Sequence, residues 1–277
     1  MCEAVIRSGV ELGLPKRDDV NGLDQEGIGY FPATIERGRR VSAARAFLDP
    51  IKRRANLTII TDAPVTRILF EGTRAVGVAC TPRGGPREFG AEREIILCAG
   101  ALQSPQLLQL SGIGPADHLR SLSLPVVCDS PGVGANLRDH WGLRLQYRLL
   151  RSGGHNPRLR GAGLWMSALR YLVCGSGVLS SAAAEVGAFI KATPGASRPD
   201  AELQISPLSV VPATGQIERR PGLQCTVRSL RPESRGTAMI RSADPTAPPA
   251  IRGNFLSAEY DRELTVHMVR YARRLLR

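Results

Sequence analysis

The residues best placed to do chemistry lie where an apolar run meets a glycine turn. Residues 94–99 (EIILCA) are apolar enough for a buried strand, and Gly100 follows them directly. Ser104 then suits the N-cap of a helix, Pro105 suits its first position, and Gly112 suits a left-handed helix end. A strand, a tight turn and a helix N-terminus together form a natural binding site for the phosphates of a nucleotide cofactor.

A second group of polar residues lies in the segment NLRDH, which contains Asn136, Asp139 and His140. Histidine is the usual general base near neutral pH, so His140 is a candidate for that role. The other histidines, at positions 118, 155 and 267, show no His-x-x-x-His or His–carboxylate spacing, and no metal site is predicted. The sequence also contains no G-x-S-x-G segment, which argues against a serine hydrolase.

Residues 100–115 (GALQSPQLLQLSGIGP) resemble the second signature of the glucose–methanol–choline (GMC) flavoprotein oxidoreductases. Other segments resemble parts of that family and follow the family's order along nearly the whole chain. They are 38–44 (GRRVSAA), 56–68 (NLTIITDAPVTRI), 131–140 (PGVGANLRDH), and 232–236 (PESRG) followed by Asp244-Pro245. The resemblance is to the bacterial choline-dehydrogenase-like branch.

The resemblance implies an α/β fold with α+β elements. Residues 1–140 would form a partial FAD-binding, doubly wound domain with a lid or loop segment. Residues 141–277 would form a mostly antiparallel-sheet substrate-binding domain that is incomplete at its C-terminus. The implied cofactor is FAD, and the implied reaction is oxidation of an alcohol, with a histidine taking the hydroxyl proton and a hydride passing to the flavin.

The resemblance also assigns individual residues to FAD. The backbone of Val65 would hold the adenine, small residues at the turn would let the chain approach the cofactor, and the NLRDH segment would lie near the flavin. Each of these also has a purely structural reading, as an ordinary strand valine, a tight turn or a domain junction. The predicted cofactor-binding residues are Val65, Ala99, Gly100, Ser104, Asn136, Asp139 and His140.

Two parts of the family pattern do not occur in the sequence. No strand is followed by G-x-G-x-x-G, and the segment that supplies the family's catalytic histidine is absent. No catalytic residue is therefore assigned, and His140 is not taken as the base. We expect a fragment of an FAD-dependent enzyme acting on the CH–OH group of a choline-like or other primary alcohol. The alternative is a non-catalytic remnant or interaction module that keeps the GMC scaffold.

Composition bears on partners and location. The net charge is +12 and the sequence pI about 10.2, and almost all of the 37 basic residues are arginine. Because they are scattered, with short clusters such as Arg273–Arg274, we expect compositional bias or an acidic facing surface, and no nucleic acid partner. An Arg-rich nucleic-acid binder remains the third hypothesis.

The six cysteines form no C-x-x-C pair, which suggests reduced thiols and a cytoplasmic location. Neither a signal peptide nor a transmembrane segment is predicted, and the electron acceptor is left open.

The periodicity of the chain predicts its elements. Helices are expected over 2–12, 43–54 and 165–173 and after Ser257, the last with Val266, Val269 and Leu276 on its buried face. Loops are expected over 18–32 and 151–163. Strands are expected over 57–61, 65–70, 75–80, 93–98, 144–150, 185–190, 201–206, 223–229 and 237–241. Candidates for the substrate pocket on these later strands are Glu185, Phe189, Glu202 and Gln204.

We expect the chain by itself to be inactive on alcohols. The purified 277-residue chain, supplied with FAD and a redox dye, should oxidise no primary alcohol, because neither the pyrophosphate-binding loop nor the base segment occurs in it. Dye reduction that depends on an added alcohol such as choline would contradict this expectation.

Overall fold

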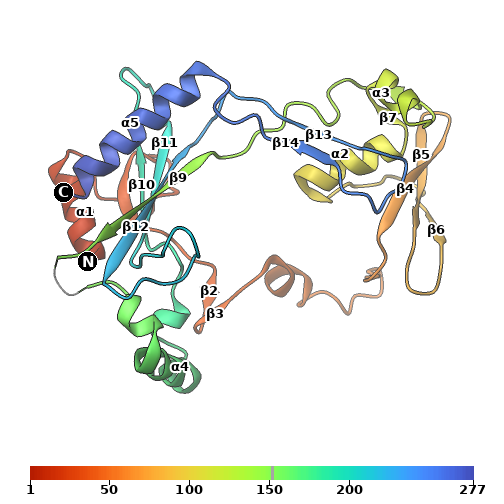
Figure 1. The fold of residues 1–277 in the computed structure, drawn as a ribbon. Coiled ribbons are helices and arrows are strands. Elements are labelled where there is room, and N and C mark those ends of the chain that lie inside the picture. The colour runs from red at the N-terminus through yellow and green to blue at the C-terminus, as the bar shows by residue number, and fades with distance from the viewer. Residues whose placement is uncertain (151–152) are drawn as a thin grey trace. The chain divides into compact units, whose positions relative to one another are not determined.

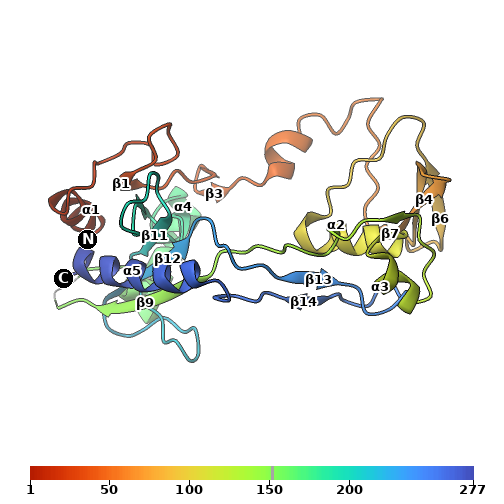
Figure 2. The same cartoon turned by 90° about the horizontal axis from the view of Figure 1, so that it is seen from above.

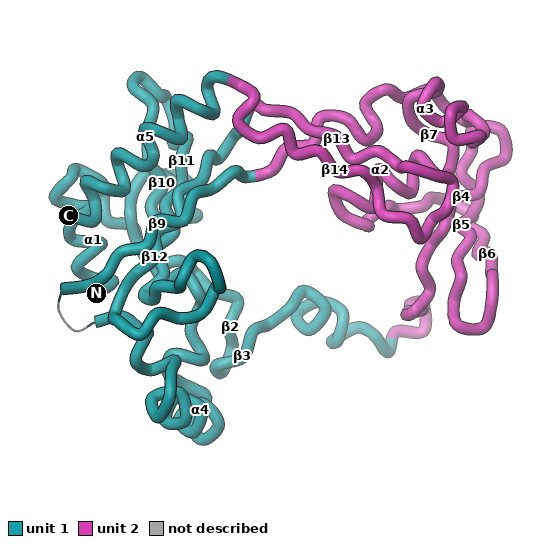
Figure 3. Tube along the Cα trace, in the orientation of Figure 1, with its two compact units in different colours: residues 1–53, 140–232, 259–277 teal, residues 54–139, 233–258 magenta. Residues whose placement is uncertain are grey.

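The chain folds into two compact units, neither of which is contiguous in sequence (Figure 3). The computed structural model describes residues 1–150 and 153–277. Unit 1 comprises residues 1–53, 140–232 and 259–277, and unit 2 comprises residues 54–139 and 233–258.

The predicted division at residues 140/141 remains a prediction about domains. The chain does pass from one unit to the other between Asp139 and His140. Residues 1–53 nevertheless group with the second half of the chain, because Gly27–Tyr30 pairs with Val186–Ile190 in one antiparallel ladder. Residues 233–258 group with the first half, through contacts with the helix over 100–110.

Unit 1 is built on a five-stranded antiparallel sheet with the order β1-β10-β11-β12-β9 (Figure 1). Its strands are β1 (Gly27–Tyr30), β9 (Gly142–Arg148), β10 (Val186–Ile190), β11 (Ala201–Ser206) and β12 (Gly222–Ser229). Its helices are α1 (Cys2–Glu11), α4 (Gly161–Cys174) and α5 (Glu259–Leu275). Short elements are β2 (Ile35–Glu36), β3 (Arg39–Arg40), a π-helical turn η1 (Ala44–Leu48), and 3-10 turns η2 (Asn156–Leu159) and η3 (Val178–Ser180).

The two faces of this sheet differ in polarity because side chains alternate along each strand. Leu203, Ile205 and Val227 are fully buried and pack with residues of α1 and α5 in one hydrophobic core. The opposite face carries Glu202 and Gln204, one position away on the same strand. The apolar face therefore forms the hydrophobic core of the unit, and the opposite face carries polar side chains, of which Glu202 is buried.

The loop expected over 18–32 in fact contains strand β1. Two glycines allow β1 to lie against residues 15–17. A Cβ at Gly29 would lie 2.1 Å from the carbonyl oxygen of Arg17, and a Cβ at Gly27 would lie 2.5 Å from the carbonyl oxygen of Pro15. Only glycine allows residues 15–17 to approach so closely that Ile28 exchanges backbone hydrogen bonds with them.

Helix α5 forms where the sequence predicts a helix, and its predicted buried face is confirmed in part. Val269 and Leu276 are partly buried and pack against the hydrophobic core, whereas Val266 is 47% exposed, so the prediction for Val266 is wrong. The buried apolar residues of the helix are Leu264, Met268, Ala272 and Leu275. At 3.6 residues per turn these lie together on one side, away from Val266. Helix α1 (residues 2–11) ends close to the predicted end at residue 12, and Gly13, with a φ of +91°, follows it.

Helix α4 includes the predicted helix over 165–173, and Gly175 ends it in a left-handed conformation. None of its residues is buried, and Trp165, Leu169 and Leu172 are 64–79% exposed. Of the loop expected over 151–163, residues 151–152 lie outside the described residues, and the remainder contains η2 and the start of α4. Among the described residues, none of the helices combines the length and apolar character needed to cross a membrane.

Unit 2 contains a three-stranded antiparallel sheet β4-β5-β6, with helix α2 against β4 (Figures 1 and 2). In both views the β13–β14 hairpin runs beside α2. The strands are β4 (Val65–Glu71), β5 (Arg74–Cys80), β6 (Arg87–Gly90), β7 (Ile113–Gly114), β8 (Cys128–Asp129), β13 (Thr237–Met239) and β14 (Ala250–Arg252). The helices are α2 (Gly100–Leu110) and α3 (Ala116–Ser121).

The strands predicted at 57–61 and 93–98 are wrong. Ile96 is 74% exposed, and no strand among the described residues pairs with either segment, so neither has the ladder that a strand requires. The fold is a mixture of helices and mostly antiparallel sheets, as expected for the α/β class. Within the described residues the only named parallel pair is β7–β8, of two residues each, so the doubly wound sheet is not formed there.

The sheet core predicts a strong contrast between two leucines. Leu203→Ala should lower the free energy of unfolding by about 2–5 kcal/mol, because it empties a fully buried site. Leu169→Ala on α4, at 64% exposure, should change it by less than about 0.5 kcal/mol. Urea denaturation followed by circular dichroism measures both, and equal losses would contradict the assignment of the core.

Candidate functional site

Unit 2 has a pocket at the start of β4 and of α2. It has a volume of about 290 Å³ and brings together Val65 and Ala99, two of the residues predicted to bind a cofactor. Val65 is 42% exposed, so part of this residue is accessible to a ligand. The remaining wall residues are Pro64, Gln103, Gln106, Leu107, Leu110 and Pro245. The pocket thus combines apolar walls with carboxamide side chains.

The helix beside this pocket begins earlier than the sequence predicts. Ala99 is the N-cap and Gly100 the first residue, so the expectation that Ser104 caps the helix and Pro105 occupies its first position is wrong. Residues 101–103 (Ala-Leu-Gln) are strong helix formers and extend the helix by a turn. Ser104 lies half-buried inside the helix and outside the pocket lining. Gly100 has a φ of +88°, and a Cβ there would meet nothing within 4 Å.

The other end of α2 is fixed to the sheet. Gly112 has a φ of +88°, which confirms the predicted left-handed helix end. The hydroxyl of Ser111 donates to the carbonyl of Leu107 at 2.6 Å and accepts the amide of Ile68 at 2.8 Å. Because Ile68 lies in the middle of β4, this buried serine sets the position of α2 against the strand that carries Val65.

Gln109 is the polar centre of unit 2, and its side chain is fully buried. Its amide nitrogen donates to the carbonyl of Ala238 at 3.1 Å, and its amide oxygen accepts the backbone N–H of Ile240 at 3.2 Å. The carboxamide thus bonds the β13 segment as a neighbouring strand would. Gly134 fits the same place, because a Cβ there would lie 2.6 Å from the carbonyl of Ala238.

The predicted residues of the NLRDH segment lie at the boundary between the two units. Asn136 and Asp139 belong to unit 2, and His140 is the first residue that returns to unit 1. All three are exposed, and Asn136 has a φ of +58°, a backbone conformation that asparagine tolerates better than most residues. None of the three lines the pocket beside Val65.

The polar face of the unit 1 sheet holds the predicted pocket candidates Glu202 and Gln204. The amide of Gln204 donates to the carboxylate of Glu202 at 2.9 Å, and Gln146 and Gln224 bond one another at 2.7 Å on neighbouring strands. Phe189, the register partner of Glu202, lies on this face too. Its ring is edge-on to the ring of Phe31, with 6.4 Å between the two ring centres.

Glu185 joins a contact that sequence spacing could not reveal. Its carboxylate lies 2.9 Å from His155 Nε2 and accepts a hydrogen bond from the Cys2 thiol at 3.3 Å. Burial, with the hydrogen bond to Glu185, raises the pKa of Cys2 to about 11, so the thiol is protonated at neutral pH and is no nucleophile. Within the described part of the chain no His, Cys, Asp or Glu cluster could hold a metal ion.

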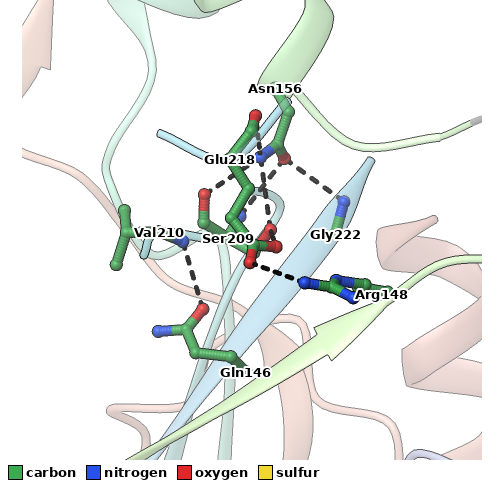
Figure 4. Close-up of polar contacts among 7 residues, drawn as sticks. All are labelled: Gln146, Arg148, Asn156, Ser209, Val210, Glu218 and Gly222. Atoms are coloured by element: carbon green, nitrogen blue, oxygen red, sulfur yellow. Dashed lines mark hydrogen bonds and ion pairs between the residues drawn. The ribbon is translucent and has the colours of Figure 1, made fainter. Parts of the chain in front are cut away.

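A buried polar cluster around Asn156 was also not predicted from the sequence (Figure 4). The Asn156 amide donates to the Ser209 and Glu218 carbonyls, and its oxygen accepts the backbone N–H groups of Ser209 and Gly222. Glu218 in turn accepts the Ser209 hydroxyl at 2.9 Å and lies 3.6 Å from Arg148. The cluster fixes the long connection between β11 and β12 to the sheet, which is a structural role.

Comparison with known sequences settles the family. The family described as "GMC oxidoreductase" matches residues 1–142. The chain is also 39% identical over 274 residues to the oxygen-dependent choline dehydrogenase of Pectobacterium carotovorum subsp. carotovorum (strain PC1). The chain belongs to the GMC oxidoreductase family. The match covers 99% of this chain and 49% of that relative, and a choline dehydrogenase of Cronobacter sakazakii, 40% identical, gives the same coverage.

Solved structures of GMC oxidoreductases agree with the fold. Pyridoxine 4-oxidase from Mesorbium loti is 28% identical with a TM-score of 0.83, over 99% of this chain and 50% of the other. A formate oxidase is 25% identical with a TM-score of 0.87, over 99% and 52%. This GMC chain therefore spans about half the length of the curated relatives it matches.

A substitution of Gln109 tests whether its side chain holds the β13 segment against α2. Gln109→Ala should lower the free energy of unfolding by roughly 1–3 kcal/mol, because it leaves the buried Ala238 carbonyl and Ile240 amide without a partner. Gln103→Ala, on the same helix but exposed, should be nearly neutral. Denaturant midpoints compare the two variants, and equal effects would mean that Gln109 does not fix the hairpin.

Proposed function

We propose that this chain supplies FAD-binding and substrate-facing elements of an FAD-dependent oxidoreductase acting on the CH–OH group of an alcohol. The observation that carries the proposal is the unit 2 pocket, which joins Val65 and Ala99 beside the open N-terminus of α2. The proposal is supported by choline dehydrogenases that match nearly the whole chain. Because the chain spans about half of their length, it would provide only part of such an enzyme.

The pocket residues fit an adenine nucleotide. Its apolar walls, Val65 and Leu107 among them, suit a flat heteroaromatic ring, and the exposed side chain of Gln103 offers hydrogen bonds to its edge. The Gln106 amide already donates to the Ala247 carbonyl at 3.0 Å. The first amide groups of α2 have no acceptor within the helix and carry its positive dipole end, which favours phosphate. When bound, FAD would supply the hydride acceptor for alcohol oxidation.

The proposal gives a role to three of the predicted cofactor-binding residues. The backbone of Val65 would hold the adenine, and Ala99 and Gly100 would let the ligand approach the helix because their side chains take little space. Ser104, Asn136, Asp139 and His140 stay predictions, with no contact to the pocket to support them. A cytoplasmic location also stays a prediction.

Unit 1 would contribute contacts to the alcohol through the polar face of its sheet. Glu202 is buried there next to Phe189, and a carboxylate beside aromatic rings suits a cationic alcohol such as choline. We assign no general base to this chain. The alternative function, a non-catalytic module that keeps the GMC scaffold, shares the sheet and differs in having no affinity for flavin.

Flavin titration tests the proposal. FAD should bind the chain saturably, measured by quenching of its fluorescence. Ala99→Trp should weaken binding by about tenfold or more, or ~1.4 kcal/mol, because the indole would fill the pocket. Ala101→Trp is the matched control: it is exposed on the same helix and outside the lining, and should leave affinity almost unchanged.

Two outcomes would count against the proposal. A folded chain that binds no FAD at millimolar concentration would favour the non-catalytic module. Equal weakening by Ala99→Trp and Ala101→Trp would place the flavin elsewhere on the chain.

A further inference from the structure

A second concave surface lies in unit 1, at the end of α5 marked C in Figures 1 and 2. This groove, of about 520 Å³, is lined by Ala192, His267, Arg270, Arg273, Arg274 and Arg277. Arg270, Arg273 and Arg274 lie on one side of α5, at spacings of three and four, and Arg277 follows two residues after the helix ends. That side lies opposite the stripe that α5 buries against the sheet.

The groove holds four guanidinium groups and no side-chain carboxylate. No acidic residue lines it, and across residues 1–150 and 153–277 none of the four arginines takes part in an ion pair. The nearby carboxylate of Glu26 is bound by Lys191 at 2.7 Å. Arg274 lies 5.2 Å from the ring centre of Tyr271, a contact that orients its guanidinium without neutralising it.

Helix capping does not account for these arginines. Basic residues in a last turn often bond the free carbonyls of the helix end. Here the Leu275 carbonyl accepts the Ser8 hydroxyl at 2.6 Å, and the Ala272 carbonyl accepts the Leu276 amide at 3.1 Å. Among the described residues, none of the four guanidinium groups donates to a carbonyl of this last turn, so they are available to a ligand.

We propose that this groove binds a small ligand that carries two or more linked phosphate groups. Guanidinium groups bond phosphate oxygens in pairs, and several of them match several phosphates. His267 Nδ1 lies 3.2 Å from the Ala192 carbonyl, which can only accept, so Nδ1 donates and Nε2 stays open to the groove's ligand. Arg270 to Arg274 span about 6 Å of helix, and Arg277 follows just after the helix end. This short stretch suits a diphosphate better than the long footprint of a nucleic acid.

Inorganic pyrophosphate is the probe for this site. Isothermal titration at physiological ionic strength should give saturable binding by the whole chain. Arg270→Ala combined with Arg274→Ala should weaken it by at least about tenfold, and the same positions changed to lysine should weaken it less, because charge remains while the paired donors are lost. Both side chains are exposed, so the fold should persist, and circular dichroism checks this.

The matched control is Arg219→Ala with Arg220→Ala. It removes the same charge from a different groove of unit 1, which also contains Glu218, and should leave pyrophosphate affinity within about twofold of the wild type. Protection of Arg270 and Arg274 from phenylglyoxal by pyrophosphate, read by mass spectrometry, gives an independent location.

Three results would overturn the inference. They are no pyrophosphate binding up to millimolar concentration, an equal loss in the control pair, or tighter binding of a short DNA duplex with a steep salt dependence that the Arg270/Arg274 variant abolishes. Ala99→Trp should not affect pyrophosphate binding at this groove, so the groove and the flavin pocket can fail separately.

Discussion

The antiparallel pairing that closes the five-stranded sheet of unit 1 is the constraint on which the rest depends. Because β1 pairs with β10, the first 53 residues are held to strands about 160 positions away in the sequence. Alternation along those strands then puts Leu203, Ile205 and Val227 on one face, where α1 and α5 cover them. The same alternation necessarily turns Glu202, Gln204 and Thr226 to the other face. The same alternation therefore produces both the hydrophobic core and the polar face of the sheet, on which we propose contacts to the substrate.

Unit 2 is stabilised in a different way. Its sheet has only three strands, and α2 is attached to its neighbours by side chains that bond backbone groups. Ser111 bonds β4, and Gln109 bonds the β13 segment. Burying such groups is favourable only when each donor and acceptor finds a partner, which fixes their positions narrowly. These bonds also fix the shape of the pocket beside Val65, because most of its walls come from β4 and α2, which Ser111 joins.

The surplus of arginine has two structural outcomes. Some arginines pair with carboxylates, as Arg148 does with Glu218 and Arg67 with Glu88. At the end of α5 the helix repeat brings Arg270, Arg273 and Arg274 to one side, and they line a groove with Arg277 that no acidic side chain lines. A composition that looks like uniform bias along the sequence therefore becomes a local concentration of positive charge in space. Exposed pairs contribute little to stability, so the unpaired groups are of more interest for binding than for folding.

The motif segments alone predicted the family correctly. The strands β4 and β5, the later antiparallel strands and the helix end at Gly112 were also predictable, because local conformation and short-range periodicity specify them. Folding of distant segments against one another is what leaves residues 94–99 without a strand, begins α2 at Gly100 and buries Leu264 of α5 rather than Val266. It alone brought His155 to Glu185, Asn156 to Ser209 and Val65 to Ala99. Such contacts depend on which distant segment supplies a partner, and no local pattern carries that information.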